Sequence, residues 1–351
     1  RAMTAQPLKP AAIERRHKIA PPSPERFLAL IGDKLAATEE VFRARLASDV
    51  PFIHHAGDYL ARSGGKRMRP ALLLLVARLL GHDSDEEVTY AAVVEFIHTA
   101  TLIHDDVIDH ATLRRGQTTV NELWGNSLTV LLGDWLYTNA MRMALSHGNL
   151  AVVRELCDAT LKMVEGELLA LQRLGSIDLS VDEYFGIIDR KTAHLFAAAC
   201  SVPCLIPSRG PQRLDAEAAQ RALRRYGKSL GTCFQLVDDL LDFTASEAEL
   251  GKPVLSDLKE GKLTLPLILL LPRVGPGERR LVQQVLEDRA FERVGPEQVL
   301  DVVRREGTVD EVEEMAHDFA EEAREALSPF APGDARDALE LAPDFVLNRR
   351  H

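Results

Sequence analysis

The spacing of the apolar residues constrains the fold of this 351-residue chain more than any other feature. From about Glu25 onward, apolar residues recur three and four positions apart, as on one face of an α-helix. The segments that follow this pattern are 27–46, 70–80, 87–109, 127–145, 150–174, 181–200, 216–243, 263–271, 278–288 and 309–327. The sequence contains no strand-like alternation of useful length. We therefore predict an all-α fold.

The breaks between these segments are short and rich in glycine or proline, as at 63–65, Gly116, 207–211 and 251–261. No long linker or short internal repeat divides the chain, so we predict one large helical bundle from residue 25 to residue 351. Residues 1–24 are rich in proline, alanine and charge, and we predict a mobile N-terminal arm there.

Charge and composition exclude several classes of protein. The net charge of −11 is a poor match to the basic surface that general nucleic-acid binding requires. The four cysteines have no common metal-binding spacing and are expected to be reduced, as in a cytoplasmic protein. No apolar stretch reaches the ~20 residues of a membrane span, and no secretory signal is predicted.

Two aspartate clusters with DDxxD spacing are the strongest chemical signal. They comprise residues 105–109 and 238–242, and each follows an apolar helical run. On a helix, residues four apart share a face, so the outer carboxylates of each cluster project together. One such cluster alone is typical of a solvated helix end, whereas two favour a shared site. An oxygen-rich site of this kind suits Mg²⁺ bound together with a phosphate.

Basic residues lie close in sequence to both clusters. The segment 64–70 joins a glycine turn to a helix start, a favourable place for an anion. Arg114 and Arg115 follow the first cluster, and arginine matches phosphate geometry. His98 shares the helix face of Asp105, although a lone histidine there is more often structural. Further candidates are Lys191, Thr192, Gln235 and Lys252.

In combination and order, these motifs resemble the trans-isoprenyl (polyprenyl) diphosphate synthase family, of the long-chain type such as octaprenyl or heptaprenyl diphosphate synthases. The segments that carry the resemblance are GGKRMRP (64–70), EFIHTATLIHDDVIDHATLRRG (95–116), GDWLY (133–137), VEGE (164–167), KTA (191–193), FQLVDDLLD (234–242) and GKP…SDLKEGKLTLP (251–266). The resemblance implies the isoprenoid synthase fold, a helical bundle around a deep central cavity, and a homodimer. It also implies that isopentenyl diphosphate condenses with an allylic diphosphate, with about three Mg²⁺ ions bound to the diphosphate.

The resemblance further assigns roles to individual residues. The principal metal ligands would be Asp105, Asp109 and Asp238, supported by Asp106, Asp239 and Asp242. The allylic diphosphate would be held by Arg114, Lys191, Thr192, Gln235 and Lys252. Isopentenyl diphosphate would be held by Lys66, Arg69, His98 and Arg115. One position departs from the family pattern GExxQ, because Ala170 stands where the family has glutamine.

Small side chains before the first aspartate cluster favour a long product. Ala100 and Thr101 lie about 7.5 Å of helix before Asp105, and neither is aromatic. Ile97 is expected to line the same chain-length cavity, with Leu128, Leu131 and Leu132 as candidates for a deeper floor. We expect a product of about thirty to fifty carbons, with a geranylgeranyl diphosphate synthase as the alternative.

Other classes fit the sequence less well. A terpene cyclase shares the first aspartate cluster but has no use for the segment 64–70 or for a second complete DDxxD. A non-catalytic partner subunit is favoured only by Ala170, and a purely structural helical protein would not combine these motifs. With a membrane, we expect at most transient contact during product release.

Overall fold

The computed structural model describes residues 29–62, 65, 67–114, 116–207, 215–244 and 254–349, so the predicted N-terminal arm lies outside it. The first elements are α2 (Gly32–Leu46), α3 (Pro51–Arg62), α4 (Met68–Leu79), α5 (Glu86–Ile108), β1 (Leu113–Arg114), β2 (Gln117–Thr118), α6 (Val120–Trp124), α7 (Asn126–Leu145) and α8 (Leu150–Gln172). The later ones are α9 (Val181–Ile188), η1 (Asp189–Ala193), α10 (His194–Leu205), α11 (Ala216–Thr244), α13 (Ser256–Lys259), α14 (Leu265–Leu270), α15 (Pro276–Asp288), α16 (Pro296–Glu306), α17 (Thr308–Ala326) and α18 (Asp334–Leu347).

The predicted all-α fold is confirmed. The strands among the described residues are a two-residue pair, β1 and β2, joined antiparallel with Leu113 opposite Thr118. Gly116 has φ +74° in the turn between them, a conformation that glycine adopts at little cost. This small hairpin was not predicted, because two residues per strand leave no readable alternation in the sequence.

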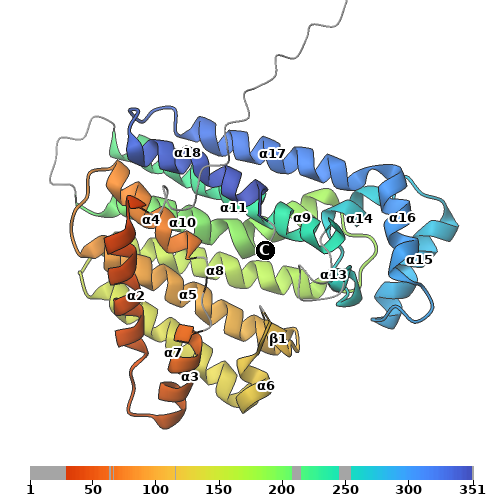
Figure 1. Ribbon diagram of the computed structural model, residues 1–351, viewed down its shortest axis with the longest axis horizontal. Coiled ribbons are helices and arrows are strands. Elements are labelled where there is room, and N and C mark those ends of the chain that lie inside the picture. Colours follow the sequence, from red (N-terminus) through yellow and green to blue (C-terminus); the bar gives the residue numbers. More distant parts are fainter. Residues whose placement is uncertain are drawn as a thin grey trace, which may run out of the picture.

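The long helices pack around a core that α4, α5, α10 and α11 share. Figure 1 shows α5, α8, α11 and α17 running across the molecule in roughly the same direction, with α2 crossing their end. Within the bundle α11 packs against α10 and α17, and α5 packs against α7. Residues 71–77 of α4 are all buried, which is why this helix reads as continuously apolar.

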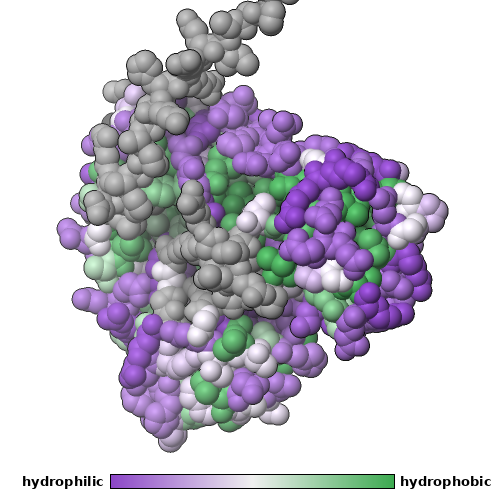
Figure 2. Space-filling model, turned by 45° about the vertical axis from the view of Figure 1, so that its right-hand side comes forward, coloured by the Kyte–Doolittle hydropathy of each residue, from purple (hydrophilic) through white to green (hydrophobic). Residues whose placement is uncertain are grey.

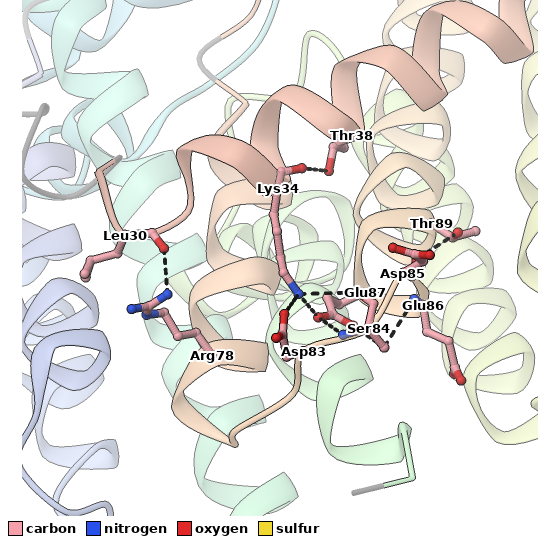
Figure 3. Close-up of polar contacts among 10 residues, drawn as sticks. All are labelled: Leu30, Lys34, Thr38, Arg78, Asp83, Ser84, Asp85, Glu86, Glu87 and Thr89. Carbon is pink, nitrogen blue, oxygen red and sulfur yellow. Dashed lines mark hydrogen bonds and ion pairs between the residues drawn. The ribbon is translucent and has the colours of Figure 1, made fainter. Parts of the chain in front are cut away.

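A partly buried ion pair holds α2 against the start of α5 and the loop that leads into it (Figure 3). The ammonium of Lys34 contacts the carboxylates of Glu87 and Asp83, and Ser84 donates to Glu87 as well. Burial alone would raise the pKa of Glu87, but the hydrogen bonds from Lys34 and Ser84 outweigh it and lower that pKa. The contact fixes the start of α5, the helix that ends at the first aspartate cluster.

Three helices of useful length were missed by the sequence prediction: α3, α16 and α18. Helix α16 begins at Pro296, directly after Gly295, and proline at the first position is a common start of a helix. The helix is short, so its apolar periodicity extends over few residues of the sequence. Figure 2 shows a mainly hydrophilic surface over the lobe that contains α15 and α16, with hydrophobic residues where it meets the rest of the chain. None of the described helices is long and apolar enough to span a membrane.

Candidate active site

The two aspartate clusters lie at the ends of α5 and α11, and the π-helical turn η1 connects them. Lys191 of η1 pairs with Glu167 of α8 and interacts with Asp105 of α5. The neighbouring residue of η1, Thr192, donates its hydroxyl to Gln235 Oε1 of α11 at 2.8 Å. One short turn therefore contacts α11 and places Lys191 within electrostatic reach of Asp105 on α5.

The turn η1 replaces part of a helix that the sequence predicted to run unbroken from 181 to 200. A π-turn inserts an extra residue into an α-helix and is frequent at functional sites. Gly166 of α8 packs directly on it, because a Cβ at this glycine would lie 2.5 Å from the backbone nitrogen of Lys191. The close approach of two backbones sets the position of Lys191 and Thr192.

The first cluster is crowded with like charge. Burial raises the pKa of Asp105 to about 6, and Glu167 and Asp109 add to the rise while Lys191 and Arg114 oppose it. Asp109 accepts from Lys262 Nζ at 2.9 Å. Burial alone would lower the pKa of Lys262, but Asp109 and Glu260 together outweigh it and raise that pKa.

Asp106 has a different partner from its neighbours. It is buried and accepts from Arg114 Nε at 2.7 Å. Burial raises its pKa, and the guanidinium of Arg114 opposes that rise. Arg114, predicted to hold the allylic diphosphate, is thus paired with the middle aspartate of the first cluster.

The three aspartates of the second cluster have three different surroundings. Asp238 is exposed and pairs with Arg349 at 3.1 Å. Asp239 is buried and accepts from both Tyr184 and Gln235. Burial raises its pKa to about 8, which these two hydrogen bonds counteract.

Asp242 anchors the chain that follows α11. It is 1% exposed and accepts from the backbone N–H and hydroxyl of Ser256 and from the backbone N–H of Asp257, at 2.8–3.1 Å. These bonds fix the start of α13 and hence the segment that carries Lys262. Asp239 and Asp242 therefore use their oxygens inside the protein.

The donor set fits magnesium. Every candidate ligand is a carboxylate oxygen, and Mg²⁺ prefers oxygen. Burial raises the pKa of Asp105, and a cation bound beside this carboxylate would favour its charged form. Within the described part of the chain, no three acidic, histidine or cysteine residues are grouped closely enough to hold a metal ion. Substrate phosphate and water are expected to supply the other ligands, as is usual for Mg²⁺.

The residues predicted to bind isopentenyl diphosphate are only partly described, because Lys66 and Arg115 lie outside the described residues, as does Lys252 of the allylic set. The guanidinium of Arg69 stacks 4.4 Å from the ring of Phe196 and 6.0 Å from that of Phe234. His98 borders a small cleft of about 90 Å³ beside Asp106 and Arg114.

Four residues beside the site had no predicted role: Tyr184, Glu167, Lys262 and Arg349. Glu167 and Lys262 lie within recognised motifs, so motif position was an available signal. Arg349 follows α18 and stacks 4.4 Å from the ring of Phe234, one turn before Asp238. Nothing in the sequence links a residue so far along the chain to the second cluster.

The helix α8 shows where the departure from the family pattern lies. Gly166, Glu167 and Ala170 share the face turned toward η1, whereas Gln172 is exposed. Gln172 therefore does not replace the glutamine that the family has at position 170.

The residues predicted to line a chain-length cavity differ in exposure. Ile97 and Ala100 are buried, and Thr101 is partly buried. Leu132 is buried as well, but Leu128 is 40% exposed and Leu131 is 63% exposed. Leu128 and Leu131 lie on the outer face of α7 in the single chain, so their place in a deeper cavity floor stays a prediction.

A family model described as polyprenyl synthetase matches residues 50–302. The chain belongs to the polyprenyl synthetase family. It is 36% identical over 315 residues to octaprenyl diphosphate synthase from Escherichia coli, covering 90% of this chain and 95% of that protein.

Solved structures agree in fold. A polyprenyl synthase from Caulobacter crescentus, complexed with calcium and isoprenyl diphosphate, matches with a TM-score of 0.87 and 37% identity, over 94% of this chain and 99% of that one. A decaprenyl diphosphate synthase from Rhodobacter capsulatus matches with a TM-score of 0.86 and 36% identity, over 93% and 99% of the two chains. The predicted isoprenoid synthase fold and prenyltransferase class are confirmed.

Proposed function

We propose that this polyprenyl synthetase extends an allylic diphosphate with isopentenyl diphosphate, in a magnesium-dependent reaction, to make a long-chain trans-polyprenyl diphosphate. The observation that carries the proposal is the arrangement around η1. Near this turn, carboxylates of α5, α8 and α11 pair with Lys262, Lys191 and Arg349. These cations could bind a diphosphate instead of the carboxylates.

The aspartates and the basic and polar residues would have different roles. Asp105, Asp109 and Asp238 would hold about three magnesium ions, which would neutralise the diphosphate and help it to leave. Lys191, Thr192, Gln235, Arg114 and Lys252 would hold the allylic diphosphate. The other three aspartates would position groups of the site without contacting the substrate. Asp106 would hold Arg114, Asp239 would hold Gln235, and Asp242 would hold the segment that carries Lys262.

The reaction follows from charge. The allylic C–O bond breaks and its electron pair leaves with the diphosphate, which the surrounding cations stabilise. Isopentenyl diphosphate, held by Lys66, Arg69, His98 and Arg115, then attacks the allylic cation with its double bond. A proton leaves the new chain for the released diphosphate, so the products are the extended diphosphate and inorganic diphosphate. Positioning of the two substrates supplies much of the rate.

The product is proposed to be long, about thirty to fifty carbons, because α5 has only small or flexible side chains one turn before Asp105. The octaprenyl and decaprenyl synthases that match this chain support that length. The matching proteins also include a short-chain isoprenyl diphosphate synthase. A geranylgeranyl diphosphate synthase therefore stays the second candidate.

A homodimer is proposed from the outer face of α7 and α8. The exposed residues Cys157, Leu161, Val164, Leu168 and Leu171 of α8 are spaced four and three apart, as in a helix–helix seam. Leu128, Leu131 and Leu145 extend the apolar surface onto α7. So large an exposed apolar patch is typical of a protein interface.

We also propose a cytoplasmic location, with at most transient membrane contact for product release and no nucleic-acid partner. All four cysteines are free, which suits a reducing compartment. The net charge of −11 disfavours nucleic acid.

A product assay tests the function directly. The protein is incubated with Mg²⁺, labelled isopentenyl diphosphate and farnesyl diphosphate, and the dephosphorylated products are sized by chromatography. We expect a ladder that ends at about thirty carbons or more, given the small side chains of α5. A stop at geranylgeraniol would establish the second candidate. No incorporation with any primer would favour a non-catalytic partner subunit, with Ala170 as the first residue to restore to glutamine.

A further inference from the structure

Tyr184 of α9 lies behind the second aspartate cluster, away from solvent. Its hydroxyl donates to Asp239 Oδ2 at 2.6 Å, and the two side chains belong to residues that are 4% and 5% exposed. The other oxygen of the same carboxylate accepts from Gln235 Nε2 at 2.8 Å. Asp239 is therefore held on one side by α9 and on the other by its own helix, α11.

The amide of Gln235 carries this arrangement on to η1. Because its nitrogen donates to Asp239, its oxygen faces the opposite way and accepts the hydroxyl of Thr192 at 2.8 Å. Turning the amide over would place its oxygen against a carboxylate oxygen, and two acceptors cannot share a hydrogen bond. The carboxylate of Asp239 thus orients the amide of Gln235 with its oxygen toward Thr192. The hydroxyl proton of Thr192 in turn points at that amide oxygen.

We propose that Tyr184 is a positioning residue for the allylic subsite. It holds Asp239, and Asp239 orients the amide of Gln235. Because Thr192 donates its single hydroxyl proton to the amide oxygen, the second Nε2–H of Gln235 is the donor that this arrangement presents to the diphosphate. The inference rests on the proposed roles of Gln235 and Thr192 in holding the allylic diphosphate. It gives Asp239 a role that uses both of its oxygens, and two hydrogen bonds connect Tyr184 to Gln235, the residue proposed to contact the diphosphate.

The test removes only the hydroxyl, by Tyr184→Phe. The substitution leaves a buried oxygen of Asp239 without its donor, so we expect the KM for farnesyl diphosphate to rise about tenfold while the KM for isopentenyl diphosphate stays within about twofold. Affinity for the unreactive thiolo analogue of farnesyl diphosphate, measured by calorimetry, should fall by the same factor.

Tyr226→Phe is the matched control. Tyr226 is also buried, and its hydroxyl donates to the carbonyl of Leu339 at 2.7 Å, remote from the aspartates. Both tyrosines lose one buried hydrogen bond, so their melting temperatures should fall by similar amounts. Both KM values of Tyr226→Phe should stay unchanged. Equal changes in both KM values of Tyr184→Phe, or none, would overturn the inference.

A double-mutant cycle separates this inference from the site on which it rests. In the Gln235→Leu background, adding Tyr184→Phe should change the allylic KM by less than about twofold, because the relay is already cut. Full additivity would refute a role that acts through Gln235. If Gln235→Leu and Thr192→Ala leave the allylic KM unchanged, the proposed allylic site itself fails. If Tyr184→Phe does not fold, Asp239→Asn, which replaces one of the two acceptor oxygens by a donor, should give the same selective rise.

Discussion

The six aspartates show how one sequence motif serves different tasks. Asp238 is exposed and paired with Arg349, whereas Asp239 is the next residue on the helix and faces inward. Asp242 shares a helix face with Asp238, yet it accepts hydrogen bonds from the backbone N–H and the hydroxyl of Ser256, at the start of α13. Hydrogen-bond partners, and not position in the motif, distinguish the exposed carboxylate of Asp238 from those of Asp239 and Asp242, which are held inside the protein.

Asp238→Ala and Asp242→Ala are expected to fail in different ways. Asp238→Ala should lower kcat by about a hundredfold or more, because the negative charge that develops on the leaving diphosphate would no longer be stabilised by a metal ion bound at Asp238. The melting temperature should change little. Asp242→Ala should lower the free energy of unfolding by about 2–4 kcal/mol, since buried donors of Ser256 and Asp257 lose a charged acceptor. Steady-state kinetics and urea unfolding separate the two, with exposed Asp310→Asn as the control. Normal turnover of Asp238→Ala would contradict the metal assignment.

Ala100→Phe tests the path of the growing chain. Ala100 is 2% exposed, in the last buried turn of α5 before Asp105. A phenyl ring there should block the tail and shorten the main product by at least one isoprene unit. The measurement is product sizing by chromatography, and Ala338→Phe, buried in α18, controls for general overpacking. An unchanged product length in a folded variant would place the tail elsewhere.

At the scale of elements, the π-turn η1 positions the cations of the site. Burial alone would lower the pKa of Lys191, but Asp105 and Glu167 outweigh it and raise that pKa. This balance requires Lys191 to lie within reach of two helices at once. The glycine of α8 that faces η1 makes the approach possible.

Gly166→Ala should displace η1. The new Cβ would lie 2.5 Å from a backbone nitrogen that cannot move without its helix. Misplacement of a positioning group by about 1 Å can cost a hundredfold in rate, so we expect kcat/KM to fall by about that factor. Gly277→Ala in α15 is the control, because nothing lies within 4 Å of its Cβ position. Equal activities of the two variants would show that η1 tolerates the shift.

The ion pair that fastens α2 predicts a pH-dependent stability. The folded pKa of Glu87 is lowered, so its contribution is present above the unfolded pKa and is lost as pH falls through the folded value. Glu87→Gln should therefore reduce the free energy of unfolding by about 2 kcal/mol at pH 7. The difference from wild type should begin to shrink below about pH 4 and should vanish once the pH is below the lowered folded pKa of Glu87. Urea unfolding at several pH values measures it, and a pH-independent difference would contradict the assignment.

At the scale of the whole molecule, the apolar side chains on α7 and α8 are the feature that a single chain does not explain. They lie on the outer side of the helices whose inner faces build the core. Their spacing continues over several turns, as a partner helix would require.

Leu161→Arg should weaken the proposed dimer. Leu161 is 57% exposed near the middle of α8, so a charge there costs little in the monomer but much in an apolar interface. We expect light scattering after gel filtration to show a shift from dimer to monomer. Glu313→Arg, on the exposed side of α17, should leave the mass unchanged. A wild-type monomer would remove the proposal.

The sequence by itself determined the helical class and the family. Apolar residues at helical spacing specify helices because they form one face that is stabilised by burial in the core. The aspartate and basic motifs identify the family because each is a short continuous segment of the sequence. Boundaries were accurate where a glycine or proline marked them, as at Leu145 and Leu150, the end of α7 and the start of α8.

The tertiary structure alone decided which motif residues face one another. Tyr184 and Asp239 are 55 residues apart, and Lys262 and Asp109 are 153 apart, so no local pattern could pair them. The π-turn at Asp189–Ala193 was also hidden, because packing against Gly166 creates it and the helical periodicity passes through it. Contacts between distant segments depend on how whole helices pack, and that information is spread over the entire chain.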